Sequence, residues 1–369
     1  MKYASYILLL SSLILIDLSH AEPTKMPQQI ANVVLPTNSE LHRLGRIHFL
    51  QDQSAILSYP GSGFQFQTNA TSLSVIVHSS GEESYMALRI DNEKPRKILL
   101  SSKPQEYLLL TQEQASFRRI EFVHNSESWH GKVTIKHFVV KGEIALAQQD
   151  TPKRNIVFIG DSVTCGEGAG REGNQDCNKN NSWWSVHQSY GWLTGEALKA
   201  EVQLVCYGGR GLIRSWDGRT NELNGPDFYE LSIAEHGAPP WNHSSFSADA
   251  VVVSLGTNDF NLGIGALPTE QEFVPPYIAF LKKILADYPQ AQVIITEGSI
   301  VNDGDPSRPQ KTVLRRYLSL IQNQVNSKRV HTFNASYFPG DKCDGHPTGP
   351  QHKKMSEELA TFLKQKMHW

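Results

Sequence analysis

A serine directly follows a short apolar segment in the middle of the chain, where a hydrolase could place a nucleophile. Residues 157–160 read Val-Phe-Ile-Gly, and Asp161 and Ser162 come next. The end of a strand in an open α/β sheet faces the crevice where such sheets bind ligands. A serine hydroxyl becomes a good nucleophile only when a neighbouring base takes its proton. Ser162 is therefore a candidate nucleophile, although a serine here, taken alone, is better explained as a helix N-cap.

The candidate base lies near the end of the sequence, in the run Asp-Gly-His-Pro at residues 344–347. His346 can accept a proton and later return it, and Asp344 can hold the imidazole in the required tautomer. His352 is a rival base, but it falls inside a predicted helix, which limits its reach toward Ser162. We therefore expect Ser162, His346 and Asp344 to be the catalytic residues.

Two further polar clusters each follow an apolar segment. Residues 207–211 read Tyr-Gly-Gly-Arg-Gly, and three glycines let a backbone approach a ligand and expose its N–H groups. Asn258 follows another segment, and an amide at that place can donate to an oxyanion. Each cluster alone is explained by a turn. Three such clusters after three predicted strands favour a binding site.

The second half of the chain contains the elements that must position these groups. Near-continuous apolar segments, typical of parallel strands buried on both faces, occur at residues 156–159, 202–206, 250–255 and 293–296. Helical stretches follow at residues 189–199, 269–287, 307–325 and 351–366. Thr269 and Glu272 have the spacing of a capping box at the start of one helix. The alternation predicts a doubly wound α/β domain with helices on both faces of a parallel sheet.

Residues from about 41 to 145 have a different pattern, an alternation of apolar and polar side chains. It is clearest at residues 72–78, 85–91 and 133–139. This period predicts an all-β antiparallel sandwich. The polar segment before residue 154 contains a proline and marks a boundary. We expect the β-sandwich domain over residues 22–148 and the α/β domain over residues 149–369.

The first residues resemble an export signal. Lys2 precedes an apolar stretch, and small residues follow up to Ala21. This pattern predicts a signal peptide over residues 1–21, with cleavage after Ala21 and a secreted or periplasmic protein. An uncleaved N-terminal anchor is the alternative; after cleavage we expect no membrane association.

Export makes the four cysteines candidates for disulfides. Cys165, Cys177, Cys206 and Cys343 allow three pairings, and the sequence does not choose among them. Pairing Cys165 with Cys177 would close the loop after Ser162, which would leave Cys206 for Cys343. Buried free thiols are the alternative.

The composition of the chain limits the classes of ligand and partner that we expect. The formal net charge of −2 gives no electrostatic reason to expect nucleic acid. No metal site or cofactor is predicted, since the histidines lack ligand spacing. Trp216 and Trp241 lie in predicted loops and could stack on sugar rings, although packing between domains would explain either. Asp161 and Arg210 are further candidates for substrate contacts, and Arg210 could instead brace its loop.

Four ordered segments resemble the conserved blocks of SGNH (GDSL-type) hydrolases. They are Gly-Asp-Ser at 160–162, Gly209, Gly-Thr-Asn-Asp at 256–259 and Asp-Gly-His-Pro at 344–347. The resemblance spans residues 155–365. It implies that Ser162 is the nucleophile and His346 the base. It also implies an oxyanion hole made of the Ser162 and Gly209 N–H groups and the Asn258 side chain.

One spacing departs from many members of that family, which place the aspartate three residues before the histidine, where this chain has Cys343. With Tyr-Gly-Gly-Arg-Gly-Leu at 207–212 and a preceding β-sandwich, the chain resembles the two-domain acetyl-sugar esterases of carbohydrate esterase family two. In these a jelly-roll domain precedes the hydrolase domain, and some members use a Ser–His dyad.

This resemblance implies a secreted serine esterase that removes O-acetyl groups from polysaccharides such as acetylated xylan or glucomannan through an acyl-enzyme intermediate. The alternatives are a short-chain lipid or peptidoglycan O-acetyl esterase on the same site, or a carbohydrate-binding protein with a degenerate hydrolase domain. The sequence contains no signal for the oligomeric state.

Overall fold

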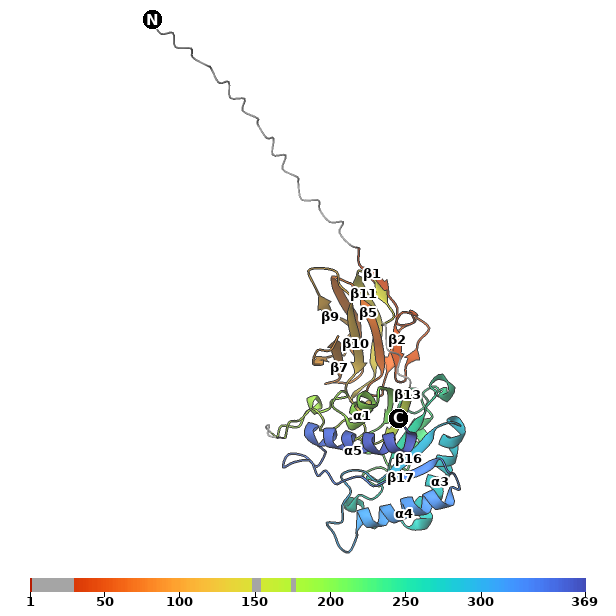
Figure 1. Ribbon diagram of the computed structural model, residues 1–369. Helices are drawn as coiled ribbons and strands as arrows, with labels where there is room; N and C mark the ends of the chain where they lie inside the picture. Colours follow the sequence, from red (N-terminus) through yellow and green to blue (C-terminus); the bar gives the residue numbers. More distant parts are fainter. Residues whose placement is uncertain (2–29, 148–153, 174–176) are drawn as a thin grey trace.

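The protein consists of an antiparallel β domain followed by an α/β domain (Figure 1). The computed structural model describes residues 30–147, 154–173 and 177–369, together with Met1. The predicted cleavage point after Ala21 and the expected domain boundary between residues 148 and 149 lie outside this part of the chain. No helix within the described ranges is both long enough and apolar enough to cross a membrane.

Two six-stranded antiparallel sheets form the β domain. The first contains β1 (Asn32–Val34), β3 (His48–Phe49), β4 (Ala55–Leu57), β6 (Ser72–Ser79), β9 (Gln105–Thr111) and β11 (Val133–Lys141). The second contains β2 (His42–Leu44), β5 (Gly63–Thr68), β7 (Tyr85–Ile90), β8 (Arg96–Leu99), β10 (Arg118–His124) and β12 (Ile144–Ala145).

The core of this domain lies between the two sheets. Phe138 of β11 packs edge-on against Phe64, Phe66 and Phe122, which all belong to the second sheet, with ring centroids 5.4 to 6.4 Å apart. Inward-facing residues alternate with more exposed ones because successive side chains of a strand point to opposite faces. The predicted β-sandwich is confirmed, and the period-two segments correspond to β6, β7 and β11.

The α/β domain contains a five-stranded parallel sheet with the strand order β14-β13-β15-β16-β17. Its strands are β13 (Arg154–Gly160), β14 (Ala200–Cys206), β15 (Ala250–Ser254), β16 (Gln292–Thr296) and β17 (Val330–Phe333). The first four coincide with the predicted apolar segments. The edge strand β17 was not predicted, since its sequence Val-His-Thr-Phe is half polar.

Helices cover both faces of this sheet (Figure 1). Val157 and Ile159 face α2 (Gly225–Tyr229), α3 (Glu270–Asp287) and α4 (Gln310–Gln324), whereas Ile156 and Phe158 face α1 (Tyr190–Leu198) and α5 (Gly349–Met367). The doubly wound prediction is therefore confirmed, as is the capping box at the start of α3. The short helix α2 was not predicted.

Buried polar contacts join the two domains. Arg46 of the β domain is fully buried, and its Nη1 donates to the carbonyl oxygens of Tyr229 and Leu231 at 2.6 and 2.8 Å. The Tyr59 hydroxyl donates to the Phe228 carbonyl at 2.6 Å. Because such groups are costly to bury without partners, these contacts fix one domain against the other.

Candidate active site

The candidate nucleophile lies at the point where the connections of the parallel sheet diverge. Ser162 follows the end of β13, and β13 is flanked by β14 on one side and β15 on the other. The chain crosses from β13 to β14 in one direction and reaches β15 in the other, and ligands of open α/β sheets bind at such switch points. The loops after β14 and β15 therefore bring Gly209 and Asn258 to the same edge of the sheet as Ser162.

Ser162, His346 and Asp344 form a continuous chain of hydrogen bonds. The Ser162 Oγ lies 2.9 Å from Nε2 of His346, and Nδ1 of His346 lies 2.6 Å from Oδ1 of Asp344. The same Asp344 oxygen accepts the backbone N–H of His346 at 2.9 Å. Asp344 thus holds the imidazole with its Nδ1 protonated, which leaves Nε2 free to accept the serine proton.

The electrostatic surroundings favour the charged forms of both partners of this pair. Burial opposes ionisation of Asp344, but hydrogen bonds from His346 and Lys179 outweigh it and hold the pKa of Asp344 well below its usual range. Burial likewise opposes the imidazolium, but the hydrogen bond to Asp344 and the negative charges of Glu167 and Asp344 outweigh it and raise the pKa of His346. His346 is therefore a stronger base than an ordinary histidine.

Glu167 is a further acidic side chain at this site. It is 6% exposed, and its Oε2 lies 3.2 Å from Nε2 of His346. Lys179 bridges the two carboxylates, with its Nζ 2.5 Å from an oxygen of Glu167 and 2.5 Å from an oxygen of Asp344. Glu167, Asp344 and His346 could each offer a ligand atom to a cation. The Lys179 ammonium already occupies the position between the two carboxylates.

The predicted oxyanion donors stand on loops at the same edge of the sheet as Ser162. Among the described residues, the backbone N–H groups of Ser162 and Gly209 donate to no protein acceptor. The Asn258 side-chain amide donates one hydrogen to the Arg210 carbonyl at 2.9 Å and lies 3.5 Å from Oδ2 of Asp161. This bond fixes the amide plane while its second hydrogen has only the distant carboxylate as a partner.

Gly209 is suited to this turn because it has a φ of +73°, a conformation that side chains rarely adopt. A Cβ at Gly209 would also lie 2.6 Å from Cδ1 of Trp216. Trp216 is 56% exposed and lies against the turn that carries Gly209, and its role as a substrate contact stays a prediction.

The structure does not bring Trp241 to this site. Its ring lies 5.1 Å from the Arg46 guanidinium, at the junction of the two domains. It lines a cavity of about 620 Å³ together with β-domain residues such as Arg43 and Phe49, and none of the catalytic candidates lines that cavity. The interpretation of Trp241 as a substrate contact was wrong, and domain packing explains it.

Asp161 and Arg210, the other candidates for substrate contacts, both have partners within the protein. The Asp161 carboxylate accepts the backbone N–H of Val163 at 3.1 Å, and burial raises the pKa of Asp161 to about 6. The Arg210 guanidinium lies 2.5 Å from Glu222 and over the ring of Tyr207. Arg210 therefore braces its loop, the alternative that the sequence left open.

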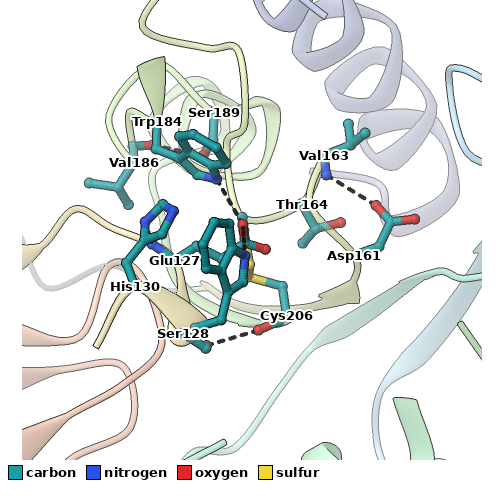
Figure 2. Close-up of a disulfide and its surroundings, with 12 residues drawn as sticks. Glu127, Ser128, His130, Asp161, Val163, Thr164, Trp184, Val186, Ser189 and Cys206 are labelled. Atoms are coloured by element: carbon teal, nitrogen blue, oxygen red, sulfur yellow. Dashed lines mark hydrogen bonds between the residues drawn. A yellow bond between two sulfur atoms is a disulfide. The ribbon is translucent and has the colours of Figure 1, made fainter. Parts of the chain in front are cut away.

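The four cysteines form two disulfides, Cys165–Cys206 and Cys177–Cys343. The pairing of Cys165 with Cys177 and the alternative of free thiols are both wrong. Cys165–Cys206 joins the turn after Ser162 to the end of β14, just before the glycine turn (Figure 2). Cys177–Cys343 joins the segment that carries Lys179 to the loop that carries the catalytic candidates.

His352 has no access to Ser162. It is fully buried in α5, and its Nδ1 accepts the backbone N–H of Tyr190 while its Nε2 donates to the Glu167 carbonyl. Burial lowers the pKa of His352 to about 4, so it stays neutral and supports the loop.

Sequence reasoning missed Glu167, Lys179 and the β-domain residue Glu127. Glu127 is fully buried, and its Oε1 lies against the Cα of Gly208, where a Cβ would be 2.2 Å away (Figure 2 shows Glu127 beside Trp184). None of the three stands at a fixed spacing from Ser162 or His346. Only the three-dimensional fold brings them together.

Family models match both domains of this chain. Residues 43–149 match the family model for the N-terminal domain of carbohydrate esterase 2, and residues 158–359 match that of the GDSL-like lipase/acylhydrolase family. The chain is 38% identical to an acetylxylan esterase / glucomannan deacetylase of Cellvibrio japonicus over 353 residues, which cover 95% of this chain and 96% of the relative. The chain belongs to carbohydrate esterase family 2.

Solved structures agree with this assignment. A family two carbohydrate esterase from Cellvibrio japonicus matches this family 2 esterase with a TM-score of 0.86 at 38% identity, over 92% of this chain and 99% of that one. A family two enzyme from Clostridium thermocellum, in complex with cellohexaose, matches with a TM-score of 0.78 at 22% identity, over 89% and 99% of the two chains. The protein is thus a carboxylic ester hydrolase, as the sequence predicted.

Proposed function

We propose that this family 2 esterase is secreted and removes O-acetyl groups from polysaccharide through an acetyl-enzyme intermediate on Ser162. The observation that carries the proposal is the unbroken chain of hydrogen bonds from Ser162 through His346 to Asp344, beside two open backbone N–H groups. The relative from Cellvibrio japonicus, an acetylxylan esterase / glucomannan deacetylase, suggests acetylated xylan or glucomannan as the substrate.

In the first half of the reaction, the Ser162 Oγ attacks the acetyl carbonyl carbon while its proton moves to Nε2 of His346. The negative oxygen of the tetrahedral intermediate is bound by the Ser162 and Gly209 N–H groups and the Asn258 amide. The imidazolium then gives its proton to the departing sugar oxygen. This step releases a free sugar hydroxyl and leaves acetyl-Ser162.

In the second half, a water molecule gives a proton to His346 and attacks the acetyl-serine carbonyl. Collapse of the second tetrahedral intermediate returns the proton to Ser162 Oγ and releases acetate. Asp344 and Glu167 both lower the free energy of the transient imidazolium, because each carboxylate lies within hydrogen-bonding distance of one ring nitrogen.

Secretion is supported by two independent features. The first residues have the pattern of a signal peptide, and both disulfides would form readily in an oxidising compartment. If secretion is correct, protein recovered outside the producing cells begins at Glu22. Mass spectrometry of that protein would reveal an uncleaved N-terminus if the proposal is wrong.

The catalytic proposal is tested by acetate release from acetylated xylan, glucomannan and peptidoglycan, with Ser162→Ala as the comparison. We expect release from a plant-type glycan and a loss of about 10⁶-fold in kcat for the variant. Hydrolysis of an aryl octanoate at a rate similar to that of an aryl acetate would favour a lipid substrate. Undiminished acetate release by Ser162→Ala would refute the mechanism.

A further inference from the structure

Tryptophans are distributed unevenly between the interior and the surface of this protein. The chain has seven, and all lie within the described residues. Only Trp129 and Trp216 are exposed, at 52% and 56% of their surface, while the others are buried or half-buried. Trp129 belongs to the β domain and Trp216 to the α/β domain, so the two come from parts of the chain that fold around separate cores.

Both exposed tryptophans approach the same glycine turn. Trp216 contacts Gly209, as described above. Trp129 reaches the turn through Glu127, because its Nε1 donates to Oε2 of Glu127 at 2.9 Å and the other oxygen of Glu127 lies against Gly208. An exposed indole is therefore associated with each of the adjacent glycines Gly208 and Gly209. Among the described residues, the backbone N–H of Gly209 has no protein acceptor.

The turn that carries Trp129 is fixed to the hydrolase domain. It forms η1 (Ser128–His130), and the Ser128 hydroxyl donates to the Cys206 carbonyl at the end of β14 (Figure 2). Glu127 also accepts the Trp184 indole N–H at 2.9 Å, as Figure 2 shows. The Trp129 indole is therefore held along its polar edge by a buried acceptor, although half of its surface faces solvent.

We propose that Trp129 is a sugar-binding platform that the β domain contributes to the polysaccharide site, with Glu127 as its positioning residue. Aromatic side chains held in one orientation bind at low entropic cost, because little freedom remains to be lost. The ligand class is a pyranose ring of a β-linked glycan, next to the sugar whose acetyl group reaches Ser162. This inference rests on the proposed function and deepens it, because it names the part of the β domain that contacts substrate.

A purely structural role accounts for the part of Trp129 that packs against His130 and Trp184, but not for its exposed surface. A tryptophan that serves packing alone is normally buried, as Trp184 is at 2% exposure. Trp129 instead places its N–H on a buried carboxyl while exposing a large apolar surface within the one loop cluster that also holds Trp216 and the oxyanion donors. Two exposed indoles around a catalytic turn form a surface suited to a chain of sugar rings.

The test compares Trp129→Ala and Trp129→Phe with Phe117→Ala. Phe117 is a suitable control because it is 54% exposed in the same domain but stands before β10, at the end of that strand away from η1. Two readouts are needed. One is kcat/KM for an acetylated xylo-oligosaccharide relative to kcat/KM for 4-nitrophenyl acetate, which carries no sugar ring. The other is the Kd for unacetylated xylohexaose and cellohexaose.

We expect Trp129→Ala to lower the oligosaccharide-to-aryl ratio and to weaken hexasaccharide binding, each by roughly tenfold. Trp129→Phe keeps an aromatic ring, so its rate ratio and its affinity for hexasaccharide should fall less. Phe117→Ala should match the wild type in both measurements. An unchanged ratio with unchanged Kd would overturn the inference. So would a parallel loss on both esters that accompanies a lowered melting temperature, because that result indicates a structural role.

The two proposals fail in distinguishable ways. If the wild type releases acetate from no glycan, the proposed function is wrong, whereas hexasaccharide binding still reports on Trp129. If acetate release from glycan is strong but Trp129→Ala binds hexasaccharide as tightly as the wild type, only the platform is wrong. Binding of neither hexasaccharide by the wild type would also refute the platform.

Discussion

Replacing Glu127 by glutamine tests whether this buried carboxyl is protonated in the folded protein at neutral pH. Glu127 is fully buried, and its Oε1 has no hydrogen-bond partner among the described residues. Burial, assisted by the negative charge of Glu167, raises the pKa of Glu127 from 4.5 to about 8. Glutamine has the shape of the protonated side chain, keeps an oxygen for the indole N–H groups of Trp129 and Trp184, and carries no charge.

The sign of the pH dependence follows from the raised pKa. The folded protein binds this proton more tightly than the unfolded chain, so the contribution of Glu127 to stability is fully present below pH 4.5 and is lost as the pH rises to about 8. The difference between the two pKa values corresponds to about 5 kcal/mol, because one unit is worth about 1.4 kcal/mol. We expect Glu127→Gln to resemble the wild type at acidic pH and to exceed its stability by several kcal/mol above pH 8.

The assay is urea unfolding followed by tryptophan fluorescence, repeated across this pH range for the wild type and Glu127→Gln. The difference in free energy of unfolding between the two proteins cancels the titration of all groups that do not interact with Glu127. Glu127→Ala serves as a control, because it removes the acceptor for two indoles and should be destabilised at every pH. Parallel curves for the wild type and Glu127→Gln would refute the assignment of a neutral carboxyl.

Four further predictions concern the catalytic residues and the disulfide that holds their loop. Asp344→Ala should lower kcat by roughly 10³- to 10⁴-fold in an aryl acetate assay, because the imidazole loses its orienting partner; a loss below about threefold would instead indicate a Ser–His dyad. The acidic limb of the kcat/KM profile should have its midpoint above the ordinary histidine pKa of 6.5, because the base must be neutral and the pKa of His346 is raised. Glu167→Gln should move that midpoint down, because it removes a negative charge beside the imidazole. An unmoved limb would show that Glu167 does not act on His346. Replacing Cys177 and Cys343 together by serine should lower the free energy of unfolding by about 2 to 5 kcal/mol, measured by thermal unfolding. It should also lower activity more than the loss of stability explains, because the disulfide holds the catalytic loop. Full activity at a temperature where the variant is folded would contradict this prediction.

The sequence predicted those strands and helices whose residue pattern matches their burial in the folded protein. The strands β13 to β16 are apolar along their length because both of their faces are buried, and this made them visible. The edge strand β17 was missed, since an edge position tolerates polar residues such as His331 and Thr332. The short helix α2 contains a glycine and a proline, and its pattern could not be distinguished from that of a loop.

Within the candidate site, the sequence could predict those residues that come soon after a recognisable strand. Ser162 and Asn258 stand directly after strands, and strand ends meet at one edge of a parallel sheet. Glu167 and Lys179 lie in a long loop whose path no periodicity describes, and Glu127 comes from the other domain. Trp241 was misassigned for the same reason, because exposure in a loop does not determine which cavity a side chain lines.

The buried Arg46 has a consequence for protein engineering. Its Nη1 donates to two main-chain oxygens of the neighbouring domain, so each domain satisfies buried polar groups of the other. Fusing the β domain to an unrelated enzyme would leave the Arg46 guanidinium without its carbonyl partners. Expressing the α/β domain alone would leave the Tyr229 and Leu231 carbonyls without their donor. Chimaeras of this enzyme should therefore exchange the residues on both sides of the domain interface together.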